Sequence, residues 1–148
     1  MQVQFSLLAP NLNKQKMVKR ICEENGIKFF AYSPLGFGIL CQEPNINNSE
    51  RNSFLRNLIF KAYDKSTLKL RKSIKQIAQT RSVSMAQVVI NWCCYQGAIP
   101  LVGIRKRSHV VDIANVFSWD LTSQEFLKLD EDSRNCLKTL PNNPFTSK

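Results

Sequence analysis

Apolar and polar residues follow two different periods along the chain, and the changes of period predict its elements. Over residues 2–8 they alternate, which is the period of two that is typical of a β-strand. Residues 27–32 form a short apolar and aromatic run after Asn25-Gly26, a pair at which helices commonly end. A further short apolar run covers residues 99–102. These three segments are the predicted strands.

Between the strands, apolar residues recur every three to four positions, which predicts amphipathic helices. The predicted helices cover residues 14–24, 65–80, 84–94, a segment from Ser108 to Phe117, and a segment from Thr122 to about Arg134. In the first helix we expect four apolar side chains to face inward: Met17, Val18, Ile21 and Cys22. Ser84 and Thr122 each begin a capping box, and Ser108 is the expected N-cap of the fourth helix. The polar stretch 42–57 is predicted as a loop.

The order of strands and helices predicts the α/β class with parallel strands. Parallel strands place their carboxyl ends at one edge of a sheet, so we expect Gln2, Tyr32 and Gly103 to lie on one side. Pro34 stops the second strand because it has no N–H to donate, and the chain then turns outward. Such strand ends are where α/β proteins build their sites.

Composition narrows the class of protein. The chain has 148 residues, 43% of them hydrophobic and 22% charged, which suits one soluble globular domain. It contains no apolar run of 18 residues and no secretory or transit pattern at its start, so neither a membrane partner nor secretion is expected. Five cysteines without a C-x-x-C pair favour a reducing compartment, the cytoplasm or an organelle interior such as the plastid stroma: Cys22, Cys41, Cys93, Cys94 and Cys136.

A net charge of +10 raises the question of nucleic-acid binding. The basic residues gather in three stretches, 14–20, 56–75 and 105–107. The first two coincide with predicted amphipathic helices, whose solvated faces account for such charge. With no helix-turn-helix, zinc-finger or ribonucleoprotein motif in the sequence, we expect no nucleic-acid partner.

Three motifs in fixed order resemble one known family. They are MQVQFSLL at the start, GIKFFAYSPLG from Gly26, and IPLVGIRK from Ile99, the last followed by a helix and WDLT. Together they resemble the second half of the aldo-keto reductases, (β/α)8 barrels that reduce carbonyl compounds with NADPH. The I-P-x-x-G-x-R pattern is most similar to the branch that includes the potassium-channel β subunits.

The resemblance runs from Gln2 to about Glu131 and implies the C-terminal portion of a TIM barrel, about strands six to eight. It also accounts for two extra helices, one after the seventh strand and one after the eighth. We expect residues 1–134 to form the partial reductase domain and residues 135–148 an irregular tail.

The resemblance implies a binding site for NADP. Gln2 matches the glutamine that hydrogen-bonds the nicotinamide carboxamide, and Tyr32 matches the aromatic residue that stacks on the ring. Four residues match the loop that passes the pyrophosphate: Ser33, Pro34, Leu35 and Gly36. Taken without the family, Tyr32 is equally a core aromatic residue and Ser33 an ordinary turn residue.

A second group of positions follows the third strand: Gly103, Ile104, Arg105 and Lys106. A loop leading into a helix N-terminus favours an anion, and its two cations suit a 2′-phosphate. The alternative is a basic surface loop. His109 and Asp112 align with family residues that face the adenosine end, while Ile113 replaces the usual asparagine.

No catalytic residue is identified in this chain. The family's tyrosine, lysine, aspartate and histidine come from earlier strands than those matched here, and His109 lacks a partner carboxylate or nucleophile. One histidine and scattered cysteines predict no metal site. Two functional interpretations stay open: an NADPH-dependent oxidoreductase acting on a small carbonyl substrate, and a non-catalytic protein. The second would be a split-barrel subunit that binds a complementing N-terminal half, a homo-oligomer, or a truncated product.

Overall fold

The computed structural model describes residues 1–9, 11–44 and 54–141. Three strands, β1 (Gln2–Gln4), β2 (Phe30–Tyr32) and β3 (Ile99–Leu101), form a parallel sheet in the order β1-β2-β3. This confirms the predicted α/β class and all three strand positions, although each strand is shorter than expected. The first strand ends early because residues 6–9 close a turn, in which the Ala9 N–H donates to the Ser6 carbonyl at 3.0 Å.

Strand pairing divides the sheet into two unlike faces. Gln2 lies opposite Phe30, and Gln4 lies opposite Tyr32. Since side chains alternate along a strand and paired residues share a face, one face carries six residues: Gln2, Gln4, Phe30, Tyr32, Ile99 and Leu101. The other face carries Val3, Ala31 and Pro100, and its Ala31 belongs to the buried core. The first face is the more open one, with Gln2, Ile99 and Leu101 all exposed.

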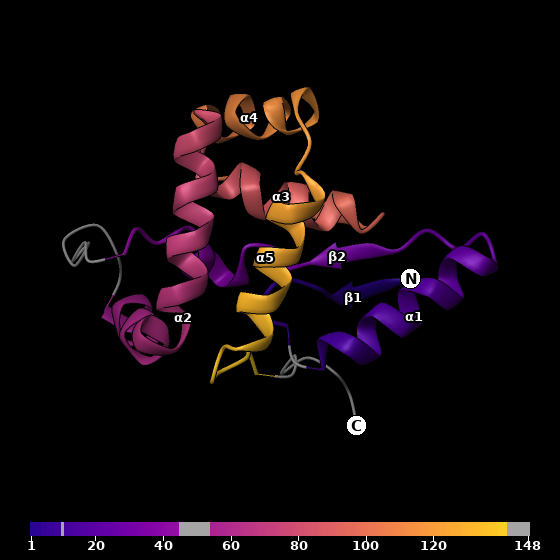
Figure 1. The fold of residues 1–148 in the computed structure, drawn as a ribbon, viewed down its shortest axis with the longest axis horizontal. Coiled ribbons are helices and arrows are strands. Elements are labelled where there is room, and N and C mark those ends of the chain that lie inside the picture. The colour runs from indigo at the N-terminus through magenta and orange to yellow at the C-terminus, as the bar shows by residue number, and fades with distance from the viewer. Residues whose placement is uncertain (10, 45–53, 142–148) are drawn as a thin grey trace.

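The core cluster that contains Ala31 of the second face also contains buried residues of several helices, and Figure 1 shows the helices around the sheet. They are α1 (Leu12–Glu24), between β1 and β2; the 3-10 helix η1 (Gly36–Cys41), α2 (Phe54–Arg81) and α3 (Met85–Tyr95), between β2 and β3; and α4 (Arg107–Ala114), η3 (Asn115–Ser118) and α5 (Ser123–Arg134), after β3. In Figure 1, α5 lies between α2 and α1, while α4 crosses the end of the molecule above α3. No helix among the described residues is long and apolar enough to cross a membrane.

An aromatic stack joins the sheet to the helices. The Phe5 ring meets Phe29 edge-on, with 5.4 Å between ring centroids, and stacks on Trp92 of α3 at 5.3 Å. Trp92 has no exposed surface, and Phe126 of α5 stacks on its ring at 6.4 Å. Aromatic pairs at such distances add roughly 0.5–1.5 kcal/mol each to the free energy gained by burying their surface. One cluster thus fixes β1, β2, α3 and α5 relative to one another.

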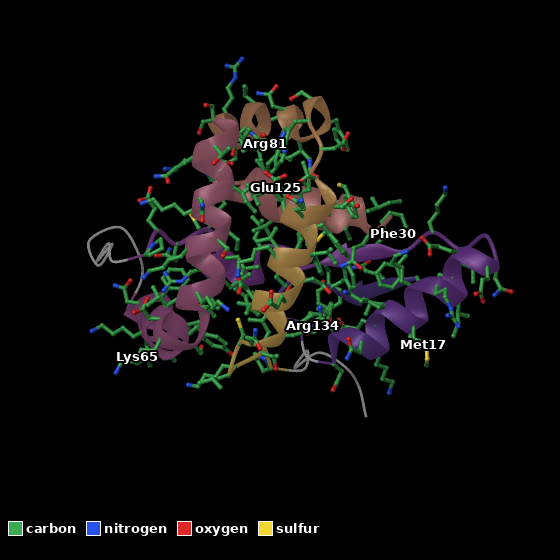
Figure 2. The ribbon with its side chains drawn as sticks, viewed as in Figure 1. Met17, Phe30, Lys65, Arg81, Glu125 and Arg134 are labelled. Atoms are coloured by element: carbon green, nitrogen blue, oxygen red, sulfur yellow. The ribbon has the colours of Figure 1, made fainter. Side chains whose placement is uncertain are left out.

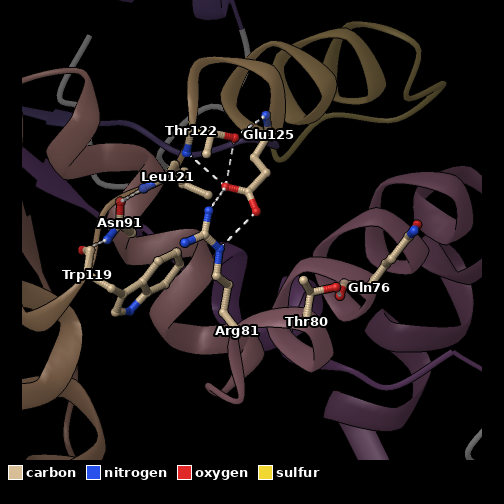
Figure 3. A network of polar contacts seen from close by, with 8 residues as sticks. All are labelled: Gln76, Thr80, Arg81, Asn91, Trp119, Leu121, Thr122 and Glu125. Carbon is tan, nitrogen blue, oxygen red and sulfur yellow. Dashed lines mark hydrogen bonds and ion pairs between the residues drawn. The ribbon is translucent and has the colours of Figure 1, made fainter.

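Polar side chains set the start of α5 (Figure 3). Thr122 and Glu125 form the predicted capping box, and Arg81 donates two hydrogen bonds to the Glu125 carboxylate at 3.1 and 2.8 Å. Burial alone would raise the pKa of Glu125, but the hydrogen bonds from Arg81 and Thr122 lower it. Asn91 of α3 accepts from the Leu121 N–H at 3.2 Å and donates to the Trp119 carbonyl at 2.8 Å. The end of α2 and the middle of α3 therefore both hold the segment that leads into α5.

Several local predictions were wrong. Met17 and Ile21 are 54% and 47% exposed and not inward-facing. Figure 2 shows Met17 on the outer side of α1. Cys22 is buried as expected. Ser108 is not an N-cap, since α4 begins at Arg107 with Lys106 in the cap position. The helix predicted over 65–80 begins at Phe54, and residues 45–53 of the predicted loop lie outside the described part of the chain.

Many basic residues of the first two stretches form ion pairs with acidic residues of the same chain. Lys16 of α1 donates to both oxygens of Asp130 at 2.7 and 2.9 Å. Asp132, which is 1% exposed, accepts from Ser73 at 2.7 Å, Lys128 at 2.9 Å and Lys69 at 3.0 Å. Further ion pairs join Lys19 to Glu23, Arg71 to Asp64 and Lys75 to Glu43. These contacts account for much of the basic character of α1 and α2 without an external partner.

We predict that Asp132→Asn makes the protein less stable and less sensitive to acid. Burial alone would raise the pKa of Asp132, but the hydrogen bonds from Ser73, Lys128 and Lys69 lower it below its ordinary value. A lowered pKa stabilises the fold above the unfolded carboxyl pKa of about 3.9, and this stability is lost as the pH falls through the folded-state value. At pH 7 the variant should lose about 1–3 kcal/mol of unfolding free energy. Denaturant titrations at pH 7 and pH 3 measure this.

The matched control is Asp120→Asn, which removes a carboxylate that is exposed and makes no hydrogen bond or ion pair within the described residues. It should unfold like the unmodified chain at both pH values. The gap between Asp132→Asn and the unmodified chain should narrow at pH 3. Equal stability of the two at pH 7 would contradict the role given to Asp132.

Candidate functional site

The candidate site lies where the strands end and their loops begin. Tyr32 is the last residue of β2, is half-buried, and belongs to the more open face of the sheet. Its neighbours across the strands are Gln4 and Leu101. An aromatic side chain at the carboxyl end of a parallel strand, on the more open face of the sheet, offers a flat surface to a planar ligand.

The loop after β2, residues 33–41, turns sharply beside Tyr32. The Gly36 N–H donates to the Ser33 carbonyl at 3.0 Å, and the Gly38 N–H donates to the Leu35 carbonyl at 3.0 Å. Ser33 has a φ of 53° and Gly36 a φ of 57°, both in the left-handed region. A left-handed serine costs conformational energy, and non-glycine residues in that region concentrate at ligand sites and tight turns. Pro34 and Gly36 are buried, so this loop packs onto the core.

The register separates Gln2 from Tyr32. Gln2 lies opposite Phe30, two positions before Tyr32, whereas Gln4 lies directly opposite Tyr32. Gln2 lies on the same open face as Tyr32 but is not paired with it across the strands. The role of Gln2 toward a carboxamide stays a prediction. Gln4, a buried polar side chain on the open face, was not among the predicted site residues. The alternation over residues 2–8 already placed it on the same face as Gln2.

The loop after β3, which we call the β3–α4 loop (residues 102–106), carries cations without partners. Gly103, Ile104, Arg105 and Lys106 are all exposed. Among the residues that the structure describes, no acidic side chain pairs with Arg105 or Lys106, in contrast to the basic residues of α1 and α2. Because α4 starts directly after this loop, its N-terminal N–H groups add to the positive potential there. His109, on α4, is exposed as well.

Asp112 is engaged within the protein. Its Oδ2 accepts from the Ser84 hydroxyl at 2.7 Å, and its Oδ1 accepts from the Gln87 side-chain amide at 2.7 Å. Ser84 is the N-cap of α3, and its hydroxyl oxygen accepts from the Gln87 N–H at 3.1 Å. The predicted capping box at Ser84 is therefore only half formed, because the Gln87 side chain reaches Asp112 and Trp119 instead.

The remaining groups with possible chemistry lie elsewhere. Tyr63 donates to the Thr139 carbonyl at 3.0 Å, and the Tyr95 hydroxyl lies 3.3 Å from that of Ser123. Within residues 1–9, 11–44 and 54–141, no three His, Cys, Asp or Glu side chains gather as a metal site. No disulfide joins any of the five cysteines. Burial raises the pKa of the Cys93 thiol, and burial followed by the charge of Asp132 raises the pKa of Cys136 to about 11, so neither forms a reactive thiolate near pH 7.

Comparison of the sequence with known proteins finds one family and several reductases. The sequence model of the Aldo/keto reductase family matches residues 1–133. The chain is 35% identical over 147 residues to the chloroplastic pyridoxal reductase of Arabidopsis thaliana, an alignment that covers 99% of the chain and 40% of that protein. It is 27% identical over 131 residues to the NADPH-dependent alpha-keto amide reductase of Saccharomyces cerevisiae, covering 88% of the chain and 35% of that protein.

Solved structures give the same result for the fold. The apo form of Gox0644 superposes with a TM-score of 0.67 at 18% identity and covers 99% of this chain, which spans 42% of Gox0644. A mutant of Gox0644 in complex with NADPH superposes with a TM-score of 0.66, also at 18% identity. The chain therefore has the fold of the C-terminal part of a (β/α)8 barrel, and it spans about 40% of the length of the relatives it matches.

We predict that Gly36→Ala destabilises the protein while Gly103→Ala does not. At Gly36 an added Cβ has room, with its nearest atoms 3.5 Å away, but the left-handed φ of 57° remains unfavourable for alanine. At Gly103 the φ lies outside that region and no atom is within 4 Å. Both changes alter the unfolded chain equally, so the variants should differ by about 1–2 kcal/mol of unfolding free energy. Thermal or urea unfolding of the pair measures this, and equal stabilities would mean that the turn at Gly36 is not required.

Proposed function

Because the chain belongs to the aldo/keto reductase family, we propose that it forms the cofactor-binding portion of an oxidoreductase that reduces aldehydes or ketones with NADPH. The reductase portion is residues 1–134. The chain spans only part of its relatives' length, so the activity belongs to the barrel that these residues help to build.

The observation that supports this proposal is the pairing of two unlike loops at one edge of the sheet. β2 and β3 are adjacent and parallel, so their loops leave from the same edge. The loop after β2 is tightly turned and packed on the core, next to the half-buried Tyr32. The β3–α4 loop is exposed, and its cations pair with no acidic side chain in the described part of the chain. A flat aromatic surface beside a cationic loop suits a ligand with a planar ring at one end and phosphates at the other.

The roles of individual residues follow from that arrangement and from the family. Tyr32 would stack on the nicotinamide ring, residues 33–36 would pass the pyrophosphate, and Arg105 and Lys106 would bind the 2′-phosphate. Gln2 would reach the carboxamide, Gly103 and Ile104 would belong to the same anion-binding loop as the two cations, and His109 would face the adenosine end. The bound cofactor supplies the hydride. In the described part of the chain no acid is placed to give the proton, since Tyr63 and Tyr95 are on helices and make contacts with other parts of the fold.

The substrate class and compartment are proposed by similarity. One relative is named a pyridoxal reductase and is chloroplastic. We therefore propose an aromatic aldehyde as the substrate of the complete barrel, and the cytoplasm or a plastid interior as its location. Nearness to the branch with the potassium-channel β subunits stays a prediction that rests on residues 99–105.

We predict that the chain prefers NADPH to NADH and that Arg105→Ala/Lys106→Ala abolishes the preference. Two charge-assisted contacts to a phosphate are lost, each worth about 1.5–3 kcal/mol. NADPH should bind to the double variant at least about a hundred-fold more weakly, and NADH binding should be unaffected. Fluorescence titration with both dinucleotides measures this.

Lys65→Ala/Lys72→Ala is the matched control, because it removes two positive charges that are also exposed but lie on α2. It should keep the preference for NADPH. If the unmodified chain binds both dinucleotides equally, the 2′-phosphate role of Arg105 and Lys106 is wrong.

A second candidate function is a non-catalytic, partner-binding subunit. β1 and β3 are the two edges of the described sheet, and Ile99 and Leu101 are each 40% exposed on its open face. On the flanks, Met17 of α1 and Val111 of α4 are exposed too. Parallel sheets are normally buried on both faces, and open edges pair with other strands. The occupant would be the complementing part of a barrel or a further copy of the chain.

We predict that the isolated chain does not reduce aromatic aldehydes with NADPH and does not behave as a well-dispersed monomer. Size-exclusion chromatography should show oligomers, aggregates or dependence on a partner that supplies the other strands. An NADPH-consumption assay with an aromatic aldehyde should show no turnover above background. A well-behaved monomer with clear turnover would overturn this prediction and would require a proton donor within these residues.

A further inference from the structure

The position of α4 depends on very few contacts. No residue of α4 is buried: Val110 and Val111 are 50% and 63% exposed, and Ile113, near its carboxyl end, is half-buried. Its carboxyl end continues into η3, where the buried Val116 anchors the chain. Its amino end follows the exposed β3–α4 loop. Packing of apolar surface therefore fixes only one end of this helix.

Asp112 supplies the contact that packing does not. Its carboxylate accepts hydrogen bonds from Ser84 and Gln87, both at 2.7 Å and both from the start of α3. Gln87 is 5% exposed, and its carbonyl oxygen accepts from the Trp119 indole N–H at 3.1 Å. Asp112, Ser84, Gln87 and Trp119 form one connected set of contacts, which we call the Asp112 network. It ties α4 to the helix that the aromatic core holds.

We infer that Asp112 is a positioning residue, which fixes α4 and with it the cationic β3–α4 loop, and is not itself a contact to the dinucleotide. The inference rests on the proposed cofactor site for its functional meaning. It differs from the alignment-based expectation for Asp112, because both carboxylate oxygens already accept hydrogen bonds within the fold. A carboxylate committed in this way orients a helix, whereas Arg105 and Lys106 make no such contacts in the described residues.

Loss of the Asp112 network would lower the fraction of molecules in which α4 is docked, and ligand binding depends on this fraction. When the docked position of α4 is only partly populated, the apparent affinity for a ligand that needs this position is the intrinsic affinity multiplied by the populated fraction. Loss of the Asp112 network would leave the loop attached to the sheet through β3 alone. Binding of a phosphate by Arg105 and Lys106 should then weaken in proportion to the loss of docking.

The test combines hydrogen exchange with dinucleotide binding in the full chain. Asp112→Ala and Gln87→Leu should each speed amide exchange in residues 107–114. If docking falls to about a tenth, the Kd for NADPH should rise roughly ten-fold. Exchange in α4 should approach the rate of the undocked segment, because the undocked state is then the major one. Val111→Ala, an exposed change on the same helix, is the matched control and should leave both unchanged.

A swapped pair separates positioning from direct contact. Asp112→Asn/Gln87→Glu reverses the hydrogen bond, because the amide then donates from position 112 to a carboxylate at position 87. Each single change should speed exchange in α4, and the double change should restore slow exchange and the Kd for NADPH. A direct ligand role predicts the opposite pattern: Asp112→Ala weakens binding, Gln87→Leu does not, and exchange in α4 is unchanged. That pattern would overturn the inference.

Failure of the proposed function is distinguishable from failure of this inference. If the unmodified chain binds no dinucleotide, the cofactor proposal fails, and exchange alone decides the role of Asp112. Unchanged exchange in residues 107–114 of Asp112→Ala would then overturn the inference, and faster exchange rescued by the swapped pair would support it.

Discussion

The stacking of Phe5 on Trp92 is the interaction on which the rest of this structure depends. It joins the segment that follows the first strand to α3, and α3 then reaches the other parts of the molecule that bear on the site. Through Asn91, α3 holds the segment that enters α5, and through Ser84 and Gln87 it holds Asp112. A buried aromatic cluster resists displacement because each ring loses both contact area and favourable geometry when it shifts. A rigid helix can thus fix a loop at its far end.

Some cations of this chain form ion pairs within the fold, and others stay available to a ligand. The chain has 21 Lys and Arg but only 11 Asp and Glu, so cations outnumber the acidic groups that could pair with them. Asp130 and Asp132 of α5 attract the lysines of α1 and α2, and Glu125 attracts Arg81. The cations of the β3–α4 loop pair with no acidic side chain among the described residues, and they stay solvated. Unpaired cations beside a helix N-terminus have the potential that an anionic ligand needs.

The open face of the sheet connects the fold to both candidate functions. Gln2, Ile99 and Leu101 are exposed on the face that carries Tyr32. In a closed barrel the corresponding face points inward, and the edges β1 and β3 pair with further strands. Under the first proposed function this surface would line the interior of a barrel, and under the second it would be the interface with a partner. The structure of the remaining strands, in whichever chain they occur, distinguishes the two.

Local sequence alone determined the order of elements, the parallel sheet and the ends of several helices. Alternation from residue 2 and the capping box at Thr122 act within a few residues, so the start of β1 and the start of α5 could be predicted without knowledge of the fold. Tertiary structure decided the rest. The outward position of Met17 depends on which elements cover α1, the separation of Gln2 from Tyr32 depends on strand register, and the contacts of Asp112 depend on a helix 25 to 28 residues away. Periodicity shows that a residue belongs to a face, but only packing determines what that face meets.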